Sequence, residues 1–306
     1  MQTDFTLGID IGGTNIAFGL VNNNGEIVYE GNLKTSEVRN PALLPELIEE
    51  KLKDHHFNNI GIGAPSSNTF SGMIENAPNL KWGVNIPIVE YFENYFKLPT
   101  KLTNDANAAA VGEKLFGAAK DFSEFVVITL GTGLGAGIFI NDKVFDGKFG
   151  TAGEFGHVMV EKEGRPCGCG RKGCLETYCS ATGMVKSIAL LSSPNKDTSP
   201  LLTLTCPTPQ DIFKAAENGD QFAEEIVEFT AEKLGYWLAN FACFSNPEAF
   251  VLFGGIAKNG ENFRQRVDNY TQKNILNLYQ GKVKVLSSEL HHKNAAILGA
   301  AAYAKY

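Results

Sequence analysis

The start of the chain contains the pattern that most constrains the fold, because it predicts three strands linked by tight turns. Apolar residues occupy alternate positions in 5–11, and alternation with a period of two indicates a strand. The glycine turn 12–14 leads into the apolar run 16–21, and Asn-Asn-Asn-Gly at 22–25 is a strong turn signal before the run 27–33. These residues predict a β-meander.

The same pattern begins again in the middle of the chain. A strand is predicted over 125–130, and Gly131-Thr132-Gly133 follows it directly. Residues 138–140 and 143–145 predict two further strands, with Asn141-Asp142 as the hairpin turn between them. Two meanders of this kind, each broken by a glycine turn, indicate a duplicated α/β unit.

Further elements follow each meander, and they are predicted from helical spacing and from short apolar runs. The expected helices are 41–52, 88–96, 106–116, 220–243, 260–276 and 294–304, and the expected strands are 59–63, 100–103, 250–253 and 283–286. We expect a smaller N-terminal domain over 1–115, with a C-terminal helix at about 293–306 packed on it, and a larger domain over 116–292. Residues 192–209 predict a surface loop and not a linker.

Length and charge narrow the class of protein. The chain has 306 residues, enough for about two domains and for a core that forms without disulfides or metals. Its 27 Lys and Arg against 34 Asp and Glu give a net charge of -7. That balance argues against a nucleic-acid-binding protein that works through a global basic surface. The 32 glycines exceed the usual share of about 7% and indicate either low complexity or tight turns beside a ligand.

The first ten residues and the cysteines bear on the compartment. The start of the chain has neither the basic nor the apolar region of a signal peptide. The longest uncharged apolar stretch, 125–140, is too short and too rich in glycine to cross a bilayer as a helix. We therefore expect a soluble cytoplasmic protein, in which cysteines are thiols or metal ligands. Cys179, Cys206 and Cys243 lack ligand spacing and are expected to be buried thiols.

The first glycine turn suits an anion. Gly12 and Gly13 let the backbone approach a ligand, its N–H groups can face a negative charge, and Thr14 adds a hydroxyl donor. Asp10 lies just before the turn among apolar residues, where a carboxylate needs a partner such as a hydrated Mg²⁺. An ordinary hairpin turn with a capping Asp is equally consistent with this turn alone.

The second glycine turn repeats this theme and makes paired phosphate loops the favoured interpretation. Gly254-Gly255, before a helix, would complete a nucleotide site. Residues 131–136 and 168–173 formally match the dinucleotide pattern, but the first is followed by a strand and the second lies in a cysteine loop. We therefore exclude both as NAD fingerprints, and no P-loop motif occurs.

Four potential metal ligands lie within eighteen residues. His157, Cys167, Cys169 and Cys174 form a Cys₃His set suited to a tetrahedral structural Zn²⁺, with no position left for a catalytic water. The alternatives are a disulfide pair or unligated thiols, but the spacing favours zinc. The ion would order a loop that has few apolar residues.

These motifs resemble those of known families. Asp10-x-Gly12-Gly13-Thr14 and Leu130-Gly131-Thr132-Gly133 resemble the two phosphate motifs of the sugar kinase/actin/Hsp70 superfamily. Glu154-x-Gly156-His157 and C-x-C-G-x-x-G-C-x-E at 167–176 resemble the signature of the ROK family (repressor, open reading frame, kinase) over essentially the whole chain. The resemblance implies an α/β, duplicated actin-like (ribonuclease H-like) ATPase fold with two domains and a nucleotide and sugar cleft between them.

The resemblance also implies site residues. Asp105, in the motif N-D-A-N-A-A-A-x-G-E, would be the general base, although from the residues alone a helix N-cap is preferred. The implied sugar ligands are Asn79, Asn104, Asp105, Glu154, His157 and Glu176. The implied ATP-binding residues are Asp10, Gly12, Gly13, Thr14, Gly131, Thr132, Gly133, Gly254 and Gly255. His157 can offer one ring nitrogen to zinc and the other to the sugar.

One segment departs from the family pattern. Residues 63–68 read Gly-Ala-Pro-Ser-Ser-Asn where the family often has a Pro-Gly-Val-Asp-like stretch beside the sugar, which leaves side-chain specificity open.

The resemblance implies a function and its cofactors. We expect ATP-dependent phosphorylation of a hexose at its 6-hydroxyl, with glucose favoured, Mg²⁺ and structural zinc as cofactors, and a homodimer or higher oligomer. The alternatives are a kinase for N-acetylmannosamine, N-acetylglucosamine, mannose or fructose, and a sugar-responsive regulator. Regulators of the family carry an N-terminal helix-turn-helix, whereas here the first strand begins at Phe5.

The positions of the glycines favour ligand turns over low complexity. Many of them fall in 8–19, 61–72, 131–137, 147–156, 164–173 and 254–260. We expect these segments to be the phosphate turns, the sugar loop, the metal loop and a nucleotide-binding strand end.

Overall fold

The computed structural model describes residues 4–52, 55–75, 77, 80–259, 261–290 and 294–306. The chain divides into two compact units, each with its own hydrophobic core. The first unit consists of Met1–Asp121, Lys143–Gly153 and Glu289–Tyr306, and the second of Phe122–Asp142 and Glu154–Ser288. The first unit thus includes residues 143–153, which the predicted domains place in the larger domain.

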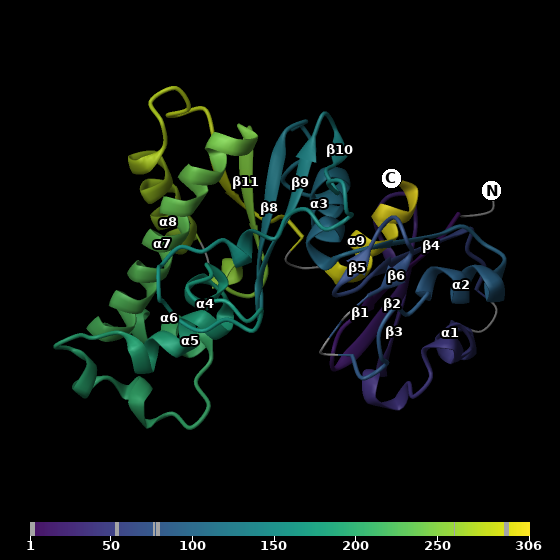
Figure 1. Ribbon diagram of the computed structural model, residues 1–306, viewed down its shortest axis with the longest axis horizontal. Helices are drawn as coiled ribbons and strands as arrows, with labels where there is room; N and C mark the ends of the chain where they lie inside the picture. The colour runs from purple at the N-terminus through teal and green to yellow at the C-terminus, as the bar shows by residue number, and fades with distance from the viewer. Residues whose placement is uncertain (1–3, 53–54, 76, 78–79, 260, 291–293) are drawn as a thin grey trace. The chain divides into compact units, whose positions relative to one another are not determined.

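The first unit is built on a five-stranded mixed sheet (Figure 1). Its strand order is β3 (Ile27–Lys34), β2 (Asn15–Val21), β1 (Thr6–Ile11), β4 (Asn59–Gly63) and β7 (Thr100–Thr103). The first three strands pair antiparallel, as the predicted meander requires, and β4 and β7 continue the sheet parallel to β1. A small hairpin of β5 (Ser67–Asn68) and β6 (Met73–Ile74) follows β4.

Helices cover both faces of this sheet. Leu7, Ile9 and Ile11 point to one face, and they share a core with buried residues of α1 (Leu44–Leu52) and α2 (Ile88–Phe96). On the opposite face, α9 (Ala295–Lys305) packs against β1 and β4 and also against α3 (Asp105–Phe116). The result is a three-layer α/β unit.

Close packing of α9 depends on glycines in the sheet. A Cβ at Gly61 would lie 1.8 Å from the carbonyl oxygen of Ala300, and one at Gly8 would lie 2.2 Å from that of Ile297. The expectation that the glycines of 8–19 and 61–72 lie beside a ligand is therefore wrong for Gly8 and Gly61. These two glycines let a helix backbone approach the sheet.

The second unit repeats the same topology. The strands β9 (Leu134–Ile140), β8 (Phe125–Leu130), β11 (Ala249–Phe253) and β12 (Lys284–Ser287) follow one another in the sheet. The pair β8–β9 is antiparallel, whereas β11 and β12 continue parallel to β8. This order matches β2–β1–β4–β7, so the predicted duplicated α/β unit is confirmed.

Strand β9 begins earlier than the predicted residue 138, because Leu134 already pairs with Leu130 across a three-residue turn. Asn141 and Asp142 then lead to β10 (Lys143–Val144), where the chain enters the first unit. The helices of the second unit are α4 (Glu176–Cys179), α5 (Ala181–Leu190), α6 (Pro209–Glu217), α7 (Gln221–Ser245) and α8 (Glu261–Asn274). Short 3₁₀ turns occur at Thr35–Glu37, Pro41–Leu43, Phe155–His157, Lys196–Thr198, Pro200–Thr203 and Ala257–Asn259.

All six cysteines are free thiols. Cys179 is buried as expected, but Cys206 and Cys243 are exposed, which corrects the prediction that they are buried. Cys206 lies in the loop before α6, and Cys243 lies near the end of α7 beside the exposed Phe244. Among the described residues, no helix combines the length and the apolar character needed to span a membrane.

Candidate functional site

Functional side chains of the first unit gather at the carboxyl ends of its parallel strands. Asp10 of β1 is in register with Gly63 of β4, which is in register with Thr103 of β7. The chain leaves β7 after Thr103 and enters α3 at Asp105. The two carboxylates of Asp10 and Asp105 therefore belong to the same edge of one sheet.

The start of α3 is fixed by its own hydrogen bonds. Asn104 is the N-cap residue, and its Oδ1 accepts a hydrogen bond from the backbone N–H of Asn107 at 2.7 Å. Asp105 is the first residue of the helix, and its Oδ1 accepts from the N–H of Ala106 at 2.9 Å. Because Asn104 provides the cap, Asp105 is not needed for that role.

Both carboxylates at this edge have raised pKa values. Desolvation raises the pKa of Asp105, and the hydrogen bond from Ala106 opposes that shift. The residue as a whole is nevertheless exposed to solvent. Burial, and secondarily the negative charge of Asp105, raise the pKa of Asp10 from 3.8 to about 6. Two neighbouring carboxylates of this kind suit a shared proton or a divalent cation.

The first glycine turn is held by a threonine that the sequence interpretation missed. The Thr35 hydroxyl donates to the carbonyl of Gly12 at 2.7 Å, and the Thr35 N–H donates to the carbonyl of Thr14 at 3.1 Å. Gly13 and Thr14 are exposed on the turn. Two carbonyls of the turn are thus occupied by protein donors, which leaves the exposed side of the turn to other partners.

The second glycine turn is held in the same way. The N–H of Ala181 donates to the carbonyl of Gly131 at 2.8 Å, and the Thr182 hydroxyl donates to the carbonyl of Thr132 at 2.7 Å. Both donors lie in the first turn of α5, whose N-cap is Ser180. The only sequence signal for these contacts is a Ser-Ala-Thr-Gly helix start, and nothing in it identifies the turn it contacts.

The glycines of these turns have different surroundings, so the physical reason for glycine differs among them. A Cβ at Gly131 or at Gly255 would meet no atom within 4 Å, and neither residue has a positive φ. Gly254 has φ 104, and a Cβ there would lie 2.7 Å from the carbonyl oxygen of Leu130. Folding therefore requires glycine at 254, whereas the open space over Gly131 and Gly255 permits a ligand to approach the backbone.

The four predicted metal ligands lie together in the second unit. The ligand atoms of His157, Cys167, Cys169 and Cys174 all lie within 4.8 Å of one another. The Cys169 and Cys174 sulfurs are 3.6 Å apart, and Cys167 Sγ is 3.6 Å from His157 Nδ1. Ligands about 2.3 Å from a tetrahedral zinc are separated by roughly 3.8 Å, so this cluster can hold a zinc ion.

Two carboxylates flank the histidine of this cluster. His157 Nδ1 is 3.5 Å from Glu176 Oε1, and its Nε2 is 3.7 Å from Glu154 Oε2. The two ring nitrogens thus face different groups. Glu176 also reaches the second glycine turn, because its Oε2 lies 2.9 Å from where a Cβ at Gly133 would be.

The candidate sugar ligands thus form two groups, each within one unit. Asn104 and Asp105 belong to the first unit, and Glu154, His157 and Glu176 to the second. Asn79, the remaining predicted sugar ligand, lies outside the described residues.

The chain is similar in sequence to known proteins over most of its length. The ROK family model matches residues 6–306. A glucokinase from Halalkalibacterium halodurans is 36% identical over 275 residues, which is 85% of this chain and 83% of that protein. A xylose repressor from Caldicellulosiruptor bescii is 33% identical over 96% of this chain and 76% of the repressor. The relatives therefore include both an enzyme and a regulator.

Solved structures match along nearly the whole chain. The structure of a ROK family glucokinase from Streptomyces griseus in complex with glucose and AMPPNP matches with a TM-score of 0.82 at 32% identity. The match covers 98% of this chain and 99% of that one. The backbone arrangement described above is therefore shared with a structure that holds a sugar and an ATP analogue.

Proposed function

Because the chain belongs to the ROK family and has its two-unit, actin-like kinase fold, we propose that it phosphorylates the 6-hydroxyl of glucose with ATP. Similarity to glucokinases supports a sugar kinase as the general class. The observation that carries the proposal is Asp105, an exposed residue at the first turn of α3 whose carboxylate has a raised pKa. A raised pKa brings a general base closer to neutral pH, where it accepts a proton most effectively.

Asp105 performs one step of the proposed transfer. Its carboxylate accepts the proton of the sugar 6-hydroxyl as that oxygen forms a bond to the γ-phosphorus of ATP. The bond between the γ-phosphorus and the β,γ-bridging oxygen breaks, and ADP leaves with that oxygen. Asn104 is held by its cap hydrogen bond, so its amide nitrogen is the group that would contact a neighbouring hydroxyl.

The glycine turns supply the proposed nucleotide contacts. Gly12, Gly13 and Thr14 in the first unit, and Gly131, Thr132 and Gly133 in the second, would contact phosphate oxygens through backbone and hydroxyl donors. Gly254 and Gly255 would take another part of the nucleotide. Mg²⁺ would supply positive charge against the phosphates, and Asp10 would help to hold it, because carboxylate oxygens are ligands for Mg²⁺ and a cation would offset the cost of burying this carboxylate.

The zinc cluster and its carboxylates supply the proposed sugar contacts of the second unit. Zinc would take the Nδ1 side of His157, where Cys167 lies, and leave Nε2 to the sugar. Glu154 and Glu176 would accept hydrogen bonds from sugar hydroxyls. Zinc has a structural role in this proposal, with all four positions filled by protein. We place the protein in the cytoplasm as a homodimer or higher oligomer.

The direct test is a substrate panel. Purified zinc-loaded protein would be given Mg-ATP with glucose, mannose, fructose, N-acetylglucosamine and N-acetylmannosamine, and ADP release would be measured. We expect kcat/KM to be highest for glucose. A higher value for another sugar would keep the kinase and replace the substrate. Absence of turnover with every sugar of the panel would refute the proposal.

A further inference from the structure

Two exposed phenylalanines stand on neighbouring turns of the first unit. Phe70 is 67% exposed and Phe149 is 78% exposed. Burial of an apolar side chain stabilises the folded state, and these two rings do not contribute that stabilisation. Two such rings on neighbouring turns form an exposed apolar surface, a feature that can mark a ligand-binding groove.

The turn that carries Phe70 is fixed by Asn68. The Oδ1 of Asn68 accepts hydrogen bonds from the N–H groups of Phe70 at 3.0 Å and Ser71 at 3.2 Å. Its Nδ2 donates to Glu75 Oε1 at 2.8 Å, which ties the turn to the other strand of the hairpin. The exposed ring of Phe70 therefore stands on an ordered backbone.

The turn that carries Phe149 packs directly against the first. Gly147 and Gly150 bracket it with φ values of 71 and 74, in the left-handed region that favours glycine. A Cβ at Gly150 would lie 2.9 Å from Asn68 Oδ1, so only glycine lets the two turns approach this closely. The same segment is joined to α3, because Asn107 Nδ2 donates to Asp146 Oδ1 at 3.1 Å.

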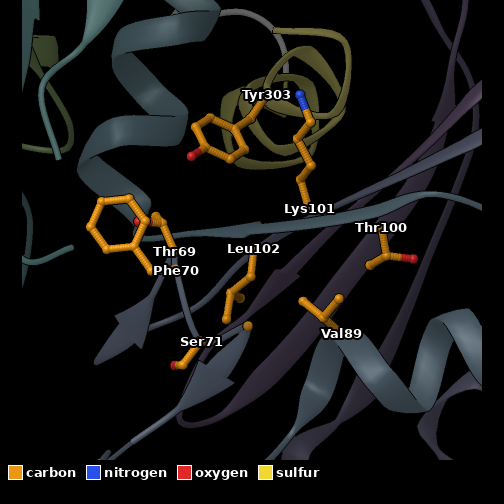
Figure 2. A pocket seen from close by; sticks show the side chains of 9 residues that line it. Thr69, Phe70, Ser71, Val89, Thr100, Lys101, Leu102 and Tyr303 are labelled. Atoms are coloured by element: carbon orange, nitrogen blue, oxygen red, sulfur yellow. The ribbon is translucent and has the colours of Figure 1, made fainter. Parts of the chain in front are cut away.

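A pocket of about 650 Å³ lies where the two turns meet. Its lining combines the two rings with polar side chains, namely Asn68, Ser71, Glu75, Lys148 and Thr151. A smaller pocket of about 230 Å³ shares Phe70 and Ser71 but lies toward β7 and α9, where Figure 2 shows Leu102, Lys101 and Tyr303. The larger pocket is the one that has both exposed rings.

Both turns of the larger pocket are connected to the elements that carry the site carboxylates. Its hairpin follows β4, whose last residue, Gly63, is in register with Asp10 and Thr103. Its other turn is tied to α3, the helix that Asp105 begins, through the bond between Asn107 and Asp146. The pocket and Asp105 therefore belong to the same unit and are joined by short segments of chain.

We propose that this pocket binds a second sugar ring, so that the enzyme's acceptor is a glucoside or disaccharide whose terminal hexose is phosphorylated. A pyranose has apolar C–H faces, which pack on aromatic rings, and hydroxyls at its rim. Glu75 can accept hydrogen bonds from those hydroxyls, and Lys148 and Thr151 can donate to them. A purely apolar ligand would leave these polar groups unmatched.

The inference rests on the proposed function for its chemistry. The terminal 6-hydroxyl loses its proton to Asp105 and gains the γ-phosphoryl group, while ADP leaves, as with glucose. The products are ADP and a disaccharide phosphorylated on its terminal ring, with the glycosidic bond intact.

The test measures binding and turnover separately on the full zinc-loaded chain. Calorimetry would compare glucose, cellobiose and maltose without nucleotide, and ADP release would compare their kcat/KM with Mg-ATP. We expect at least one disaccharide to bind at least tenfold more tightly than glucose. Phe149→Ala should weaken that disaccharide at least tenfold and glucose less than threefold. Phe149→Leu, which keeps apolar bulk without a ring, should weaken the disaccharide at least fivefold.

Phe244→Ala is the matched control, because Phe244 is 88% exposed at the far end of α7 in the other unit. It should leave all three affinities unchanged. Equal or weaker binding of both disaccharides than of glucose would overturn the inference, as would equal losses for glucose and disaccharide in Phe149→Ala. Tight binding of a disaccharide without turnover of any sugar would support the pocket as a sugar site and would refute only the proposed kinase activity.

Discussion

Strand β1 of the first unit has a carboxylate next to its last residue, whereas strand β8 of the second has a hydroxyl at the same place. Asp10 pairs with Gly63 on the neighbouring parallel strand, and Thr129 pairs with Phe253 on its own neighbour. Asp10 has a pKa raised to about 6, but the Thr129 hydroxyl is satisfied by the N–H of Gly135 at 3.1 Å. The Asp10 carboxylate at the edge of the first sheet would therefore be stabilised by a proton or a cation, whereas the Thr129 hydroxyl at the equivalent edge needs neither.

Apart from that difference, the two glycine turns are held by the same kinds of hydrogen bond. Each turn has carbonyls held by a threonine hydroxyl and a nearby backbone N–H, from Thr35 in one unit and from Ala181 and Thr182 in the other. The two units therefore share the hydrogen bonds that hold the glycine turn, but only the first unit has a carboxylate beside its turn. This division suits phosphoryl transfer, because a carboxylate at both turns would repel the phosphates from two sides.

The sharpest way to break the comparison is to remove the proposed general base, Asp105, from the first unit. Asp105→Asn should lower kcat with glucose by roughly 100-fold to 10,000-fold, because general base catalysis contributes roughly 10²–10⁴. Sugar affinity should change less than fivefold, since the amide keeps the shape of the side chain. Steady-state kinetics and calorimetry measure the two effects. Asp197→Asn, on an exposed 3₁₀ turn of the second unit, is the control; a kcat within tenfold of the wild type for Asp105→Asn would remove Asp105 from the base role.

The same substitution at two glycines should separate folding from ligand contact. Gly61→Ala should lower the free energy of unfolding by roughly 3 kcal/mol, because the new Cβ would lie 1.8 Å from the Ala300 carbonyl oxygen. Gly131→Ala should leave that free energy within about 0.5 kcal/mol and raise the KM for Mg-ATP about tenfold. Urea denaturation and kinetics measure the two quantities. An unchanged KM in Gly131→Ala would mean that the space over this turn is not used by the nucleotide.

The raised pKa of Asp10 predicts a pH dependence that Thr129 cannot produce. The unfolded chain ionises this group near 3.8 and the folded one near 6, so its contribution to stability is present below 3.8 and is lost as pH rises through 6. Without Mg²⁺, Asp10→Asn should be more stable than the wild type above pH 6, by roughly 1–3 kcal/mol, and equal to it near pH 4.

Urea denaturation of the zinc-loaded protein at several pH values measures this effect. The pKa of Asp105 is also raised, so the free energy of unfolding of Asp10→Asn should still fall as the pH rises, but less steeply than that of the wild type. Thr129→Val, at the equivalent position, should shift stability by the same amount at every pH. If Asp10→Asn and the wild type had parallel stability profiles between pH 4 and 7, the account of Asp10 would be wrong.

The smallest expected effects come from removing the threonine hydrogen bonds that hold the two glycine turns. Thr35→Val and Thr182→Val each remove one hydroxyl donor to a turn carbonyl, a bond that contributes about 1 kcal/mol. Each should raise the KM for Mg-ATP by roughly threefold to tenfold while the KM for glucose changes less than twofold. Thr198→Val, whose hydroxyl donates within an exposed turn, is a control that should change neither value. An effect from only one of the two threonines would show that the turns are not equivalent in use.

Features coded by neighbouring residues were predictable from the sequence. The first strand follows from alternation and the other meander strands from short apolar runs beside turn signals. The four metal ligands lie close in the chain at a spacing that brings them together. Features that depend on distant residues were not. Thr35 and Thr182 contact turns far from them in sequence, and residues 143–153 join a unit that their neighbours in the chain do not.

The glycines show why composition alone misleads. Gly8 and Gly131 each follow an apolar residue in a strand-and-turn pattern, yet one faces a helix backbone and the other faces open space. The distinction depends on where α9 packs, and α9 is made of residues almost three hundred positions from Gly8. The exposure of Cys206 and Cys243 was missed for a similar reason, because their burial depends on which side of a loop or helix meets the core.

The fit of α9 onto glycines of the first sheet has a consequence for the order in which the molecule folds. The helix packs against β1, from which it is separated by almost three hundred residues of chain. Contacts between residues so far apart in sequence form slowly, because the entropy of closing a long loop is lost before the contacts stabilise it. We therefore expect the face of the first sheet that α9 covers to remain open to solvent until late in folding.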